Sequence, residues 1–382
     1  MGEERFRRDA VTQLTYAMLG LWGFLLYAFG PALPELRREL DVSRAVVSLH
    51  TTLIAFGGIV VGLTGDRVIV RLGRRRAFWG AAATIAVSAA SLALAHTLAV
   101  TLPAAFVLGV AGALAVSLIQ ATLADHHGGF AAAAIVEANA LAVALGAAAP
   151  LAIAAAILLG GDWRAVFLSA ALLAVPLLAL LYRSVAFPAA PALPHGHTPA
   201  LPATYWLYWS SLLVFVAIEF CIVFWSTDFL ESERSLSESA AAASAGTFLL
   251  GMAAGRAAGG RLARGIAAEL LLGIALGVTM LGFTAFWLVP AAAVAVAGLF
   301  VAGLGVSLLY PLTLTLGIAS SGGRTDAAST RAAFAAGLAI ALAPFFLGAL
   351  ADQTSLSRAY AIVPVLLAAG AATLLVARSR RA

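Results

Sequence analysis

One carboxylate lies in the middle of a long apolar stretch. Between Leu212 and Trp225 the only charged residue is Glu219, and the rest are aliphatic or aromatic residues and one cysteine. A helix over residues 204–230 would be about 40 Å long, which places Glu219 near the centre of any bilayer that the helix crosses. A carboxylate at that depth is unfavourable unless it is protonated, paired or facing a wet cavity. We therefore interpret Glu219 as a protonation site, because desolvation disfavours the charged form of a carboxyl.

Two further charged residues lie inside apolar segments. Glu137 is about 10 Å from one end of the segment 130–159, where it is either a second proton site or the partner of an arginine. Arg256 is about 12 Å from one end of the segment 239–263. We expect Arg256 to form a structural ion pair or to reach the membrane interface with its long side chain. The candidate proton-coupling residues are thus Glu219 and Glu137.

The composition predicts a membrane protein. Of the 382 residues, 62% are hydrophobic and 11% are charged, whereas a soluble domain carries about 25% charged residues. The mean hydropathy is +1.00. The net charge is +5, and the positive residues are gathered in short segments between apolar runs. This distribution is typical of membrane topology. We therefore reject nucleic-acid binding as the reason for the positive charge. We predict an all-α membrane protein embedded in a lipid bilayer.

Apolar runs long enough to span a bilayer recur along the whole chain. They predict about twelve transmembrane helices, arranged as two pseudo-symmetric six-helix bundles. The expected spans are Thr12–Pro34, Ala45–Gly65, Ala77–His96, Leu98–Leu123, Phe130–Leu159, Trp163–Tyr182, Thr204–Leu230, Ser239–Ala263, Ala268–Leu288, Pro290–Ile318, Ala327–Leu350 and Arg358–Ala377.

The longest break between spans is rich in proline. Prolines occupy positions 188, 191, 194, 199 and 202, and such a density prevents a continuous helix. The chain therefore divides into an N-terminal six-helix bundle at 1–182, a linker at 183–203 and a C-terminal six-helix bundle at 204–382. Equal halves favour a parallel repeat with a substrate site between them near the midplane. Because one chain holds both halves, we expect a monomer.

Arginine is distributed unequally between the two sides of the membrane. Clusters at 5–8, 67–76 and 378–381 fall on one side, and the arginines of the other side are partly offset by acids. Positive residues favour the cytoplasmic side. The sequence thus predicts a multi-pass protein of the cell inner membrane with the linker and both termini in the cytoplasm.

No cofactor or metal is expected. His195 and His197 form a pair in the linker, which we interpret as solvated side chains rather than metal ligands. The phosphate-binding pattern Gly-x-x-x-x-Gly-Lys is absent, which argues against ATP-driven pumping. No arrangement of a nucleophile and a base indicates an enzyme.

The most specific motif joins the second and third spans. It reads GLTGDRVIVRLGRRR over residues 62–76. Gly62 and Gly65 would permit close helix approach, and Gly73 suits a turn. The pattern Asp-Arg-x-x-x-Arg-x-Gly-Arg-Arg resembles the signature loop of the major facilitator superfamily. The resemblance implies a conformational latch between the halves, formed by Gly62, Asp66, Arg67, Arg71, Gly73 and Arg74.

Several later segments are similar to the fucose–proton symporter branch of that family. They include the stretch 215–219 with Trp225, the pair Gly246-Thr247 and the pair Tyr310-Pro311. Sugar transporters of that branch carry membrane acids and amides in the first and fourth spans, whereas here the first span offers only aromatic residues and the fourth offers Ser117 and Gln120. Since buried sugars need many hydrogen bonds, a more hydrophobic or amphipathic solute suits this chain better.

A site for a small organic solute needs aromatic walls and a few converging polar groups. Each candidate of this kind is equally compatible with packing alone. The candidate substrate-binding residues are Tyr27, Gln120, Asn139, Trp225, Thr247 and Tyr310.

The sequence as a whole predicts secondary active, proton-coupled transport of a small organic solute by alternating access. Glu219 is the expected principal protonation site, and uptake by symport is favoured over the other modes. Two alternatives stay open. The first is a proton-driven exporter of hydrophobic or drug-like compounds, and the second is a membrane sensor that binds a ligand without transporting it.

Overall fold

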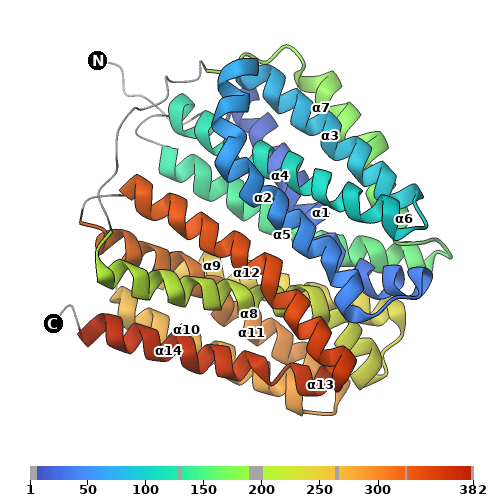
Figure 1. Cartoon of the computed structure of the whole chain (residues 1–382), viewed down its shortest axis with the longest axis vertical. Coiled ribbons are helices and arrows are strands. Elements are labelled where there is room, and N and C mark those ends of the chain that lie inside the picture. The colour runs from blue at the N-terminus through green and yellow to red at the C-terminus, as the bar shows by residue number, and fades with distance from the viewer. Residues whose placement is uncertain (1–6, 128–130, 189–200, 263–265, 323–324, 380–382) are drawn as a thin grey trace.

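The protein is almost entirely helical, as Figure 1 shows. A computed structural model describes residues 7–127, 131–188, 201–262, 266–322 and 325–379. The helices are α1 (Ala10–Leu40), α2 (Arg44–Leu72), α3 (Arg74–Leu94), α4 (Leu98–His127), α5 (Ala131–Leu158), α6 (Arg164–Ser169), the π-helical turn η2 (Ala170–Ala174), α7 (Val175–Tyr182), α8 (Ala203–Arg234), α9 (Glu238–Leu262), α10 (Ala268–Leu288), α11 (Ala292–Ala319), α12 (Thr325–Gln353), α13 (Leu356–Ala359) and α14 (Ile362–Ser379).

The all-α membrane prediction is confirmed. Within the described residues, eleven helical stretches are long and apolar enough to cross a membrane. The predicted span at 239–263 is not among them, although it forms the helix α9, which carries Glu238, Arg256 and Arg261 and is less apolar than its neighbours. Part of the predicted linker, 189–200, lies outside the described residues together with its two histidines.

The helices form two groups that lie side by side. In Figure 1 the helices α1–α7 (blue to green) occupy the upper part and α8–α14 (yellow-green to red) the lower part. We call them the first and second halves. In the first half α1 packs on α5 and α2 on α4, and in the second half α11 packs on α9 and α10. The halves are joined mainly by α2 with α12, α5 with α9, and α1 with α8, and α1 also lies against α9.

The elements α6, η2 and α7 follow one another without a break and form one span. Consecutive spans run in opposite directions, so their connections alternate between two ends of the molecule. One end carries the α1–α2 and α8–α9 connections, and we call it the α1–α2 end. The other carries the α2–α3 connection, which is the single residue Gly73, and we call it the α2–α3 end. At the α1–α2 end, α1 stops at Asp41 in the left-handed conformation and α2 starts with a side-chain cap from Ser43.

The two halves touch closely where α1 crosses α8. A Cβ atom on Gly30 would overlap the backbone carbonyl of Val223, so glycine is required for this approach. The contact fixes the middle of α1 against the middle of α8. It brings Tyr27 of α1 near the part of α8 that carries Glu219.

Candidate functional site

Four polar side chains from four helices form an electrostatic cluster between the halves. The Glu219 carboxyl of α8 interacts with the positive charge of Arg256 on α9. The phenols of Tyr27 on α1 and Tyr310 on α11 interact with both charges. Glu219 is only 6% exposed. We call these four residues the central cluster.

Helix geometry explains why Glu219 and Arg256 lie at a similar depth. Helices α8 and α9 are consecutive and antiparallel, and they pack against each other. Glu219 lies 15 residues before the end of α8 at Arg234, and Arg256 lies 18 residues after the start of α9 at Glu238. The Arg256 backbone is therefore about 5 Å further from the α1–α2 end. Because side chains lean toward the N-terminus of their helix, Arg256 reaches back to the level of Glu219.

The polar atoms of the central cluster have unused hydrogen-bonding capacity. Within the described part of the chain, none of the four side chains forms a hydrogen bond, and Glu219 and Arg256 form no direct ion pair. None of their polar atoms is fully enclosed by protein either. Since polar groups in a protein interior normally have partners, the cluster has the character of a site that accepts a ligand, water or protons.

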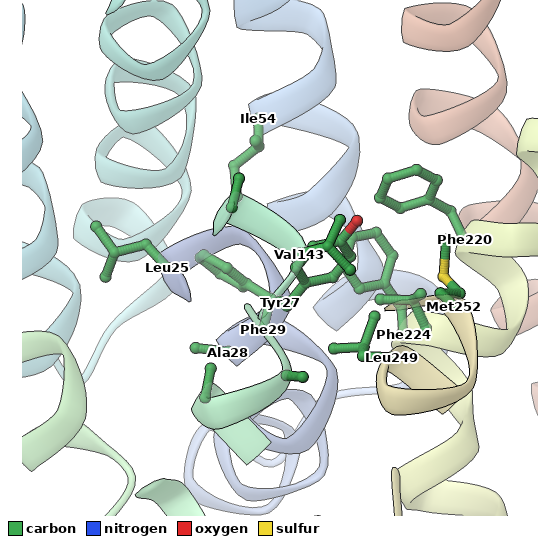
Figure 2. Close-up of a cluster of buried hydrophobic side chains, with 14 of the residues drawn as sticks. Leu25, Tyr27, Ala28, Phe29, Ile54, Val143, Phe220, Phe224, Leu249 and Met252 are labelled. Atoms are coloured by element: carbon green, nitrogen blue, oxygen red, sulfur yellow. The ribbon is translucent and has the colours of Figure 1, made fainter. Parts of the chain in front are cut away.

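Apolar side chains surround Tyr27, the member of the central cluster that comes from the first half. Figure 2 shows the Tyr27 ring among Phe220 and Phe224 of α8, Leu249 and Met252 of α9, and neighbouring residues of α1 and α5. These apolar side chains are all buried. An apolar setting strengthens electrostatic interactions and raises the cost of an uncompensated charge.

Gly146 of α5 provides the space for Tyr27. A Cβ atom on Gly146 would overlap the Tyr27 ring, which packs directly on the glycine backbone. Gly80 of α3 is also inside a helix, but nothing lies within 4 Å of the Cβ that it would acquire. The two glycines therefore form a matched pair for measuring the effect of this contact.

The substitution Gly146→Ala is expected to destabilise the protein, whereas Gly80→Ala is expected to be neutral or stabilising. Extra volume in a packed interior costs about 1–3 kcal/mol, while alanine in an open helix position gains up to about 1 kcal/mol over glycine. The measurement is the apparent melting temperature of the purified protein in detergent. Equal shifts for the two variants would contradict the Tyr27–Gly146 packing.

The other candidate substrate-binding residues do not interact with the central cluster. Trp225 is buried and donates its indole N–H to the Pro344 carbonyl at 2.9 Å. Thr247 donates to the Ser244 carbonyl at 2.7 Å. The remaining two are exposed side chains of α4 and α5, namely Gln120 and Asn139. Their role in substrate binding stays a prediction, while Tyr27 and Tyr310 are the two candidates that interact electrostatically with Glu219.

Glu137 pairs with an arginine at the α2–α3 end. Arg8 donates to the two carboxylate oxygens of Glu137 at 2.9 and 2.7 Å, and the Tyr16 hydroxyl donates at 3.1 Å. Of the two roles expected for Glu137, the structure shows the pairing with an arginine. Its role as a second proton site stays a prediction.

Asp9 fixes the start of α1 to the end of α4 at the same end of the molecule. It caps α1 by accepting hydrogen bonds from the Thr12 backbone and hydroxyl, and it pairs with His126 at 2.6 Å. Burial raises the pKa of the Asp9 carboxyl, but these hydrogen bonds and the nearby His126 outweigh burial, so the pKa is lowered overall.

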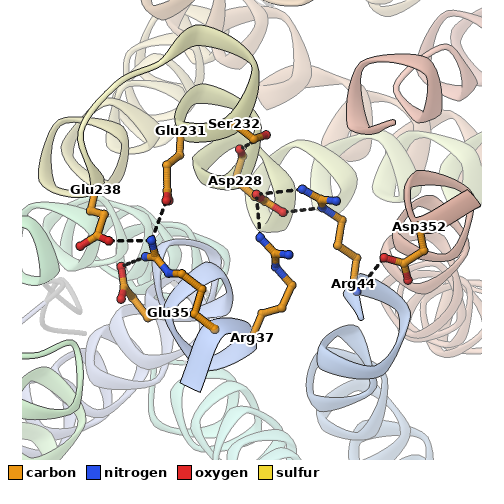
Figure 3. A network of polar contacts seen from close by, with 9 residues as sticks. Glu35, Arg37, Arg44, Asp228, Glu231, Ser232, Glu238 and Asp352 are labelled. Carbon is orange, nitrogen blue, oxygen red and sulfur yellow. Dashed lines mark hydrogen bonds and ion pairs between the residues drawn. The ribbon is translucent and has the colours of Figure 1, made fainter. Parts of the chain in front are cut away.

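At the α1–α2 end, an ion-pair network joins the two halves, as Figure 3 shows. Asp228 of α8 is 2% exposed and pairs with Arg44 at 2.7 Å and with Arg37 at 3.5 Å. Arg38 pairs with Glu231 at 2.7 Å and with Glu238 at 2.6 Å. We call these six residues the interhalf network.

A carboxylate of α12 extends the same connection. Asp352 accepts hydrogen bonds from the backbone N–H groups of Arg44 at 2.9 Å and Ala45 at 2.7 Å. These N–H groups belong to the first turn of α2, where a helix favours negative charge. In the sequence alone, the charges of this end indicate only membrane topology. The alternation of arginines and acids in the α1–α2 and α8–α9 connections is the signal that could have indicated ion pairs between the halves.

The α2–α3 end has no comparable network between the halves among the described residues. Among the described residues, no ion pair connects the halves there. Nothing lies within 4 Å of a Cβ on Gly62, and Leu63 beside it is 77% exposed. The close helix approach expected at Gly62 is therefore not made in this conformation. A hydrogen bond between α2 and α12 lies nearer the other end, from the Thr52 hydroxyl to the Ala341 carbonyl at 2.6 Å.

The signature motif is mostly helix. Helix α2 continues to Leu72, and only Gly73, with a φ of 78°, forms the turn. Arg74 is buried and donates to Asp125 of α4 at 2.6 Å. Arg67 and Arg71 are exposed. The side chain of Asp66 lies outside the part of the chain that the structure describes.

Replacing Arg74 with alanine is expected to lower the apparent melting temperature more than replacing Arg76. Arg74 is buried and bonded to Asp125, whose side chain is 43% exposed, and losing a hydrogen bond to a charged group costs about 1.5–3 kcal/mol. Arg76 is exposed, so its removal is expected to change stability by less than about 0.5 kcal/mol. Thermal denaturation of both purified variants checks this, and similar losses would show that Arg74 is not an anchor of the turn.

Comparison with known proteins identifies relatives of the fold. The sequence model described as the Major Facilitator Superfamily matches residues 15–344. A bacterial homologue of the human lysosomal transporter Spinster, in an inward-facing and occupied conformation, is similar over 97% of this chain and 96% of its own, with a TM-score of 0.76 and 16% identity. Its inward-facing, unoccupied form has a TM-score of 0.72 at 16% identity, over 98% and 94% of the two chains.

A variant of the nucleoside transporter NupG is also similar. It has a TM-score of 0.75 and 10% identity, over 97% of this chain and 98% of its own. At such identities the likeness concerns the fold alone. No curated protein sequence matches the chain at a significant level.

Proposed function

This chain belongs to the Major Facilitator Superfamily, and from that premise we propose that it is a proton-coupled secondary transporter of a small organic solute. Membrane transport follows from the family. The coupling to protons, the alternating-access cycle and the direction of transport are proposals. Uptake by symport is the mode that we favour.

The central cluster is the observation that carries the proposal. Glu219 is buried between the halves, and within the described residues it has no hydrogen bond or direct ion pair. A carboxyl in this setting changes its charge when water reaches it from either side, because burial and hydration favour opposite protonation states. The cluster includes residues of both halves, so a relative movement of the halves would change the surroundings of Glu219.

The asymmetry of the two ends supports alternating access. The interhalf network closes the α1–α2 end, whereas no ion pair between described residues joins the halves at the α2–α3 end. In the cycle that we propose, the network breaks and the Gly62 face of α2 docks on the second half, as expected of a latch. The arginine-rich α2–α3 end would be cytoplasmic, with both termini on that side of the cell inner membrane.

Solute-induced proton movement tests the proposal. The purified protein is first screened against sugars, nucleosides, carboxylates and hydrophobic amines by thermal stabilisation, since a ligand that binds the native state raises its apparent stability. Stabilising solutes are then added to proteoliposomes that contain a pH indicator. We expect protons to enter together with the solute.

The other outcomes are equally informative. Protons that leave as the solute enters would indicate the exporter alternative. Solute binding with neither solute nor proton movement would indicate a sensor, and solute movement without protons would contradict the coupling.

A further inference from the structure

We propose that Arg256 binds the anionic group of the solute, and that the substrates are organic monoanions with an apolar body. The proposal deepens the transport function proposed above and rests on it. It gives Arg256 a role different from the structural ion pair that the sequence suggested.

The charged and titratable groups around Glu219 are few. Helices α1, α9 and α11 contribute Tyr27, Arg256 and Tyr310. Tyr360, just before α14, donates its hydroxyl to the Cys221 carbonyl at 3.3 Å and is therefore engaged. Among the described side chains of α12 and α13, the charged residues lie near the helix ends, namely Arg331, Asp352 and Arg358.

Charge balance points to an anion. When Glu219 is ionised, its charge and that of Arg256 cancel. When Glu219 takes up a proton, Arg256 is left with a positive charge that no other described group on the neighbouring helices compensates, which is unfavourable at this depth in a membrane. A monoanion beside Arg256 restores neutrality. Proton loading and anion binding therefore favour each other, and each cycle moves one proton and one anion with no net charge.

The donors that such an anion needs are available. Arg256 forms no hydrogen bond or ion pair within the described residues, and its guanidinium nitrogens are not enclosed. The planar guanidinium matches the two oxygens of a carboxylate. The hydroxyls of Tyr27 and Tyr310 are likewise unbonded, so they supply two more donors to the same anion.

The apolar surroundings specify the rest of the solute. The side chains beside Tyr27 are Phe220, Phe224, Leu249 and Met252, all buried (Figure 2). They offer sugar hydroxyls no hydrogen-bond donor and no acceptor stronger than the Met252 sulfur. An aliphatic or aromatic body fits this setting, because it buries apolar surface without leaving polar groups unsatisfied.

A panel of monocarboxylates, each paired with its neutral amide, tests the charge requirement. The panel runs from propionate to decanoate and from benzoate to naphthoate, and binding is measured as thermal stabilisation of the purified full chain between pH 8 and pH 5.5. We expect at least one carboxylate to bind about tenfold or more tightly than its amide. We also expect carboxylate binding to strengthen as the pH falls, because protonated Glu219 no longer competes for Arg256.

Variants assign the effect to Arg256. With Arg256→Gln, carboxylate binding is expected to fall to the level of the amide, and retained amide binding shows that the variant is folded. Arg256→Lys is expected to recover part of the loss. With Glu219→Gln, carboxylate binding is expected to lose its pH dependence. The matched control is Arg261→Gln, at the exposed end of the same helix, which should bind as the parent protein does.

The proposal is overturned if no panel member prefers the carboxylate form, or if Arg256→Gln binds carboxylates as the parent does. Failure of the proposed transport function has a different signature. Carboxylates would then bind through Arg256, but Glu219→Gln would leave proton movement unchanged, or no solute would cross the membrane.

Discussion

Proteoliposomes that contain Glu219→Gln are expected to lose proton-driven accumulation of solute while still exchanging solute across the membrane. Glutamine keeps the shape and polarity of the side chain but takes up no proton. For one proton per solute, a gradient of one pH unit supports about tenfold accumulation, since it corresponds to about 1.4 kcal/mol. We expect the ratio of internal to external solute to fall from about tenfold to unity in the variant.

The measurement uses the solute that gives the largest thermal stabilisation. Accumulation is followed with an imposed pH gradient, and exchange is followed as counterflow without one. Glu137→Gln is the comparison variant, because Arg8 and Tyr16 already hold that carboxylate at the α2–α3 end. If Glu219 is the principal site, this variant keeps gradient-driven accumulation. Full accumulation by Glu219→Gln would rule out the central role of that carboxyl.

The substitution Asp228→Asn is expected to open the α1–α2 end. Asp228 is buried and pairs with both Arg37 and Arg44 across the two halves. Removing one partner of a buried ion pair costs about 3–5 kcal/mol because the remaining charge stays unpaired. Separation of the halves lets water reach the two arginines and so relieves this cost. A shift of about 3 kcal/mol would change the ratio of open to closed molecules by about a hundredfold.

Labelling of a single cysteine measures this shift. Phe224→Cys places a thiol one helical turn from Asp228, and Cys221→Ala removes the natural thiol. A membrane-impermeant maleimide is applied from the α1–α2 side to intact cells or oriented vesicles. We expect it to label the thiol of Phe224→Cys faster when Asp228→Asn is also present. The control is Asp162→Asn at the same end. The Asp162–Arg164 pair lies within the first half, and the Asp162 side chain is 47% exposed.

Unchanged labelling with a lower melting temperature would contradict the role of the interhalf network in closing the α1–α2 end. The interhalf network would then be a structural contact only. Faster labelling in both Asp228→Asn and the Asp162→Asn control would indicate general loosening of this end rather than release of the halves.

Much of the fold was predictable because its main determinant is local. A span of about 20 apolar residues is recognisable by itself, since each helix satisfies its own backbone hydrogen bonds in a bilayer. The burial of Glu219 was predictable for the same reason, because a helix as long and apolar as α8 places its middle away from water. The motif at residues 62–76 indicated the family that the comparison then established.

The sequence was less informative where helices from distant parts of the chain meet. Trp225 and Thr247 are polar enough to suggest a binding role. The partner of Trp225 is a carbonyl of α12, and those of Thr247 are carbonyls of α9 and α11. Gly62 is suited to close approach, yet whether a neighbour approaches depends on the conformational state. The sequence alone presents Arg37 and Arg44 as loop charges, although their carboxylate partner, Asp228, is about 190 residues away along the chain.

The sequence by itself determined that the chain is a helical membrane protein with a carboxylate at mid-depth, because hydropathy and length act within each span. Only the tertiary structure decided that Arg256, Tyr27 and Tyr310 converge on Glu219 and that charged connections close one end. Those relations depend on the rotation and register of packed helices. Neither of these is encoded in the hydropathy of a single span, because many orientations of an apolar helix bury similar surface.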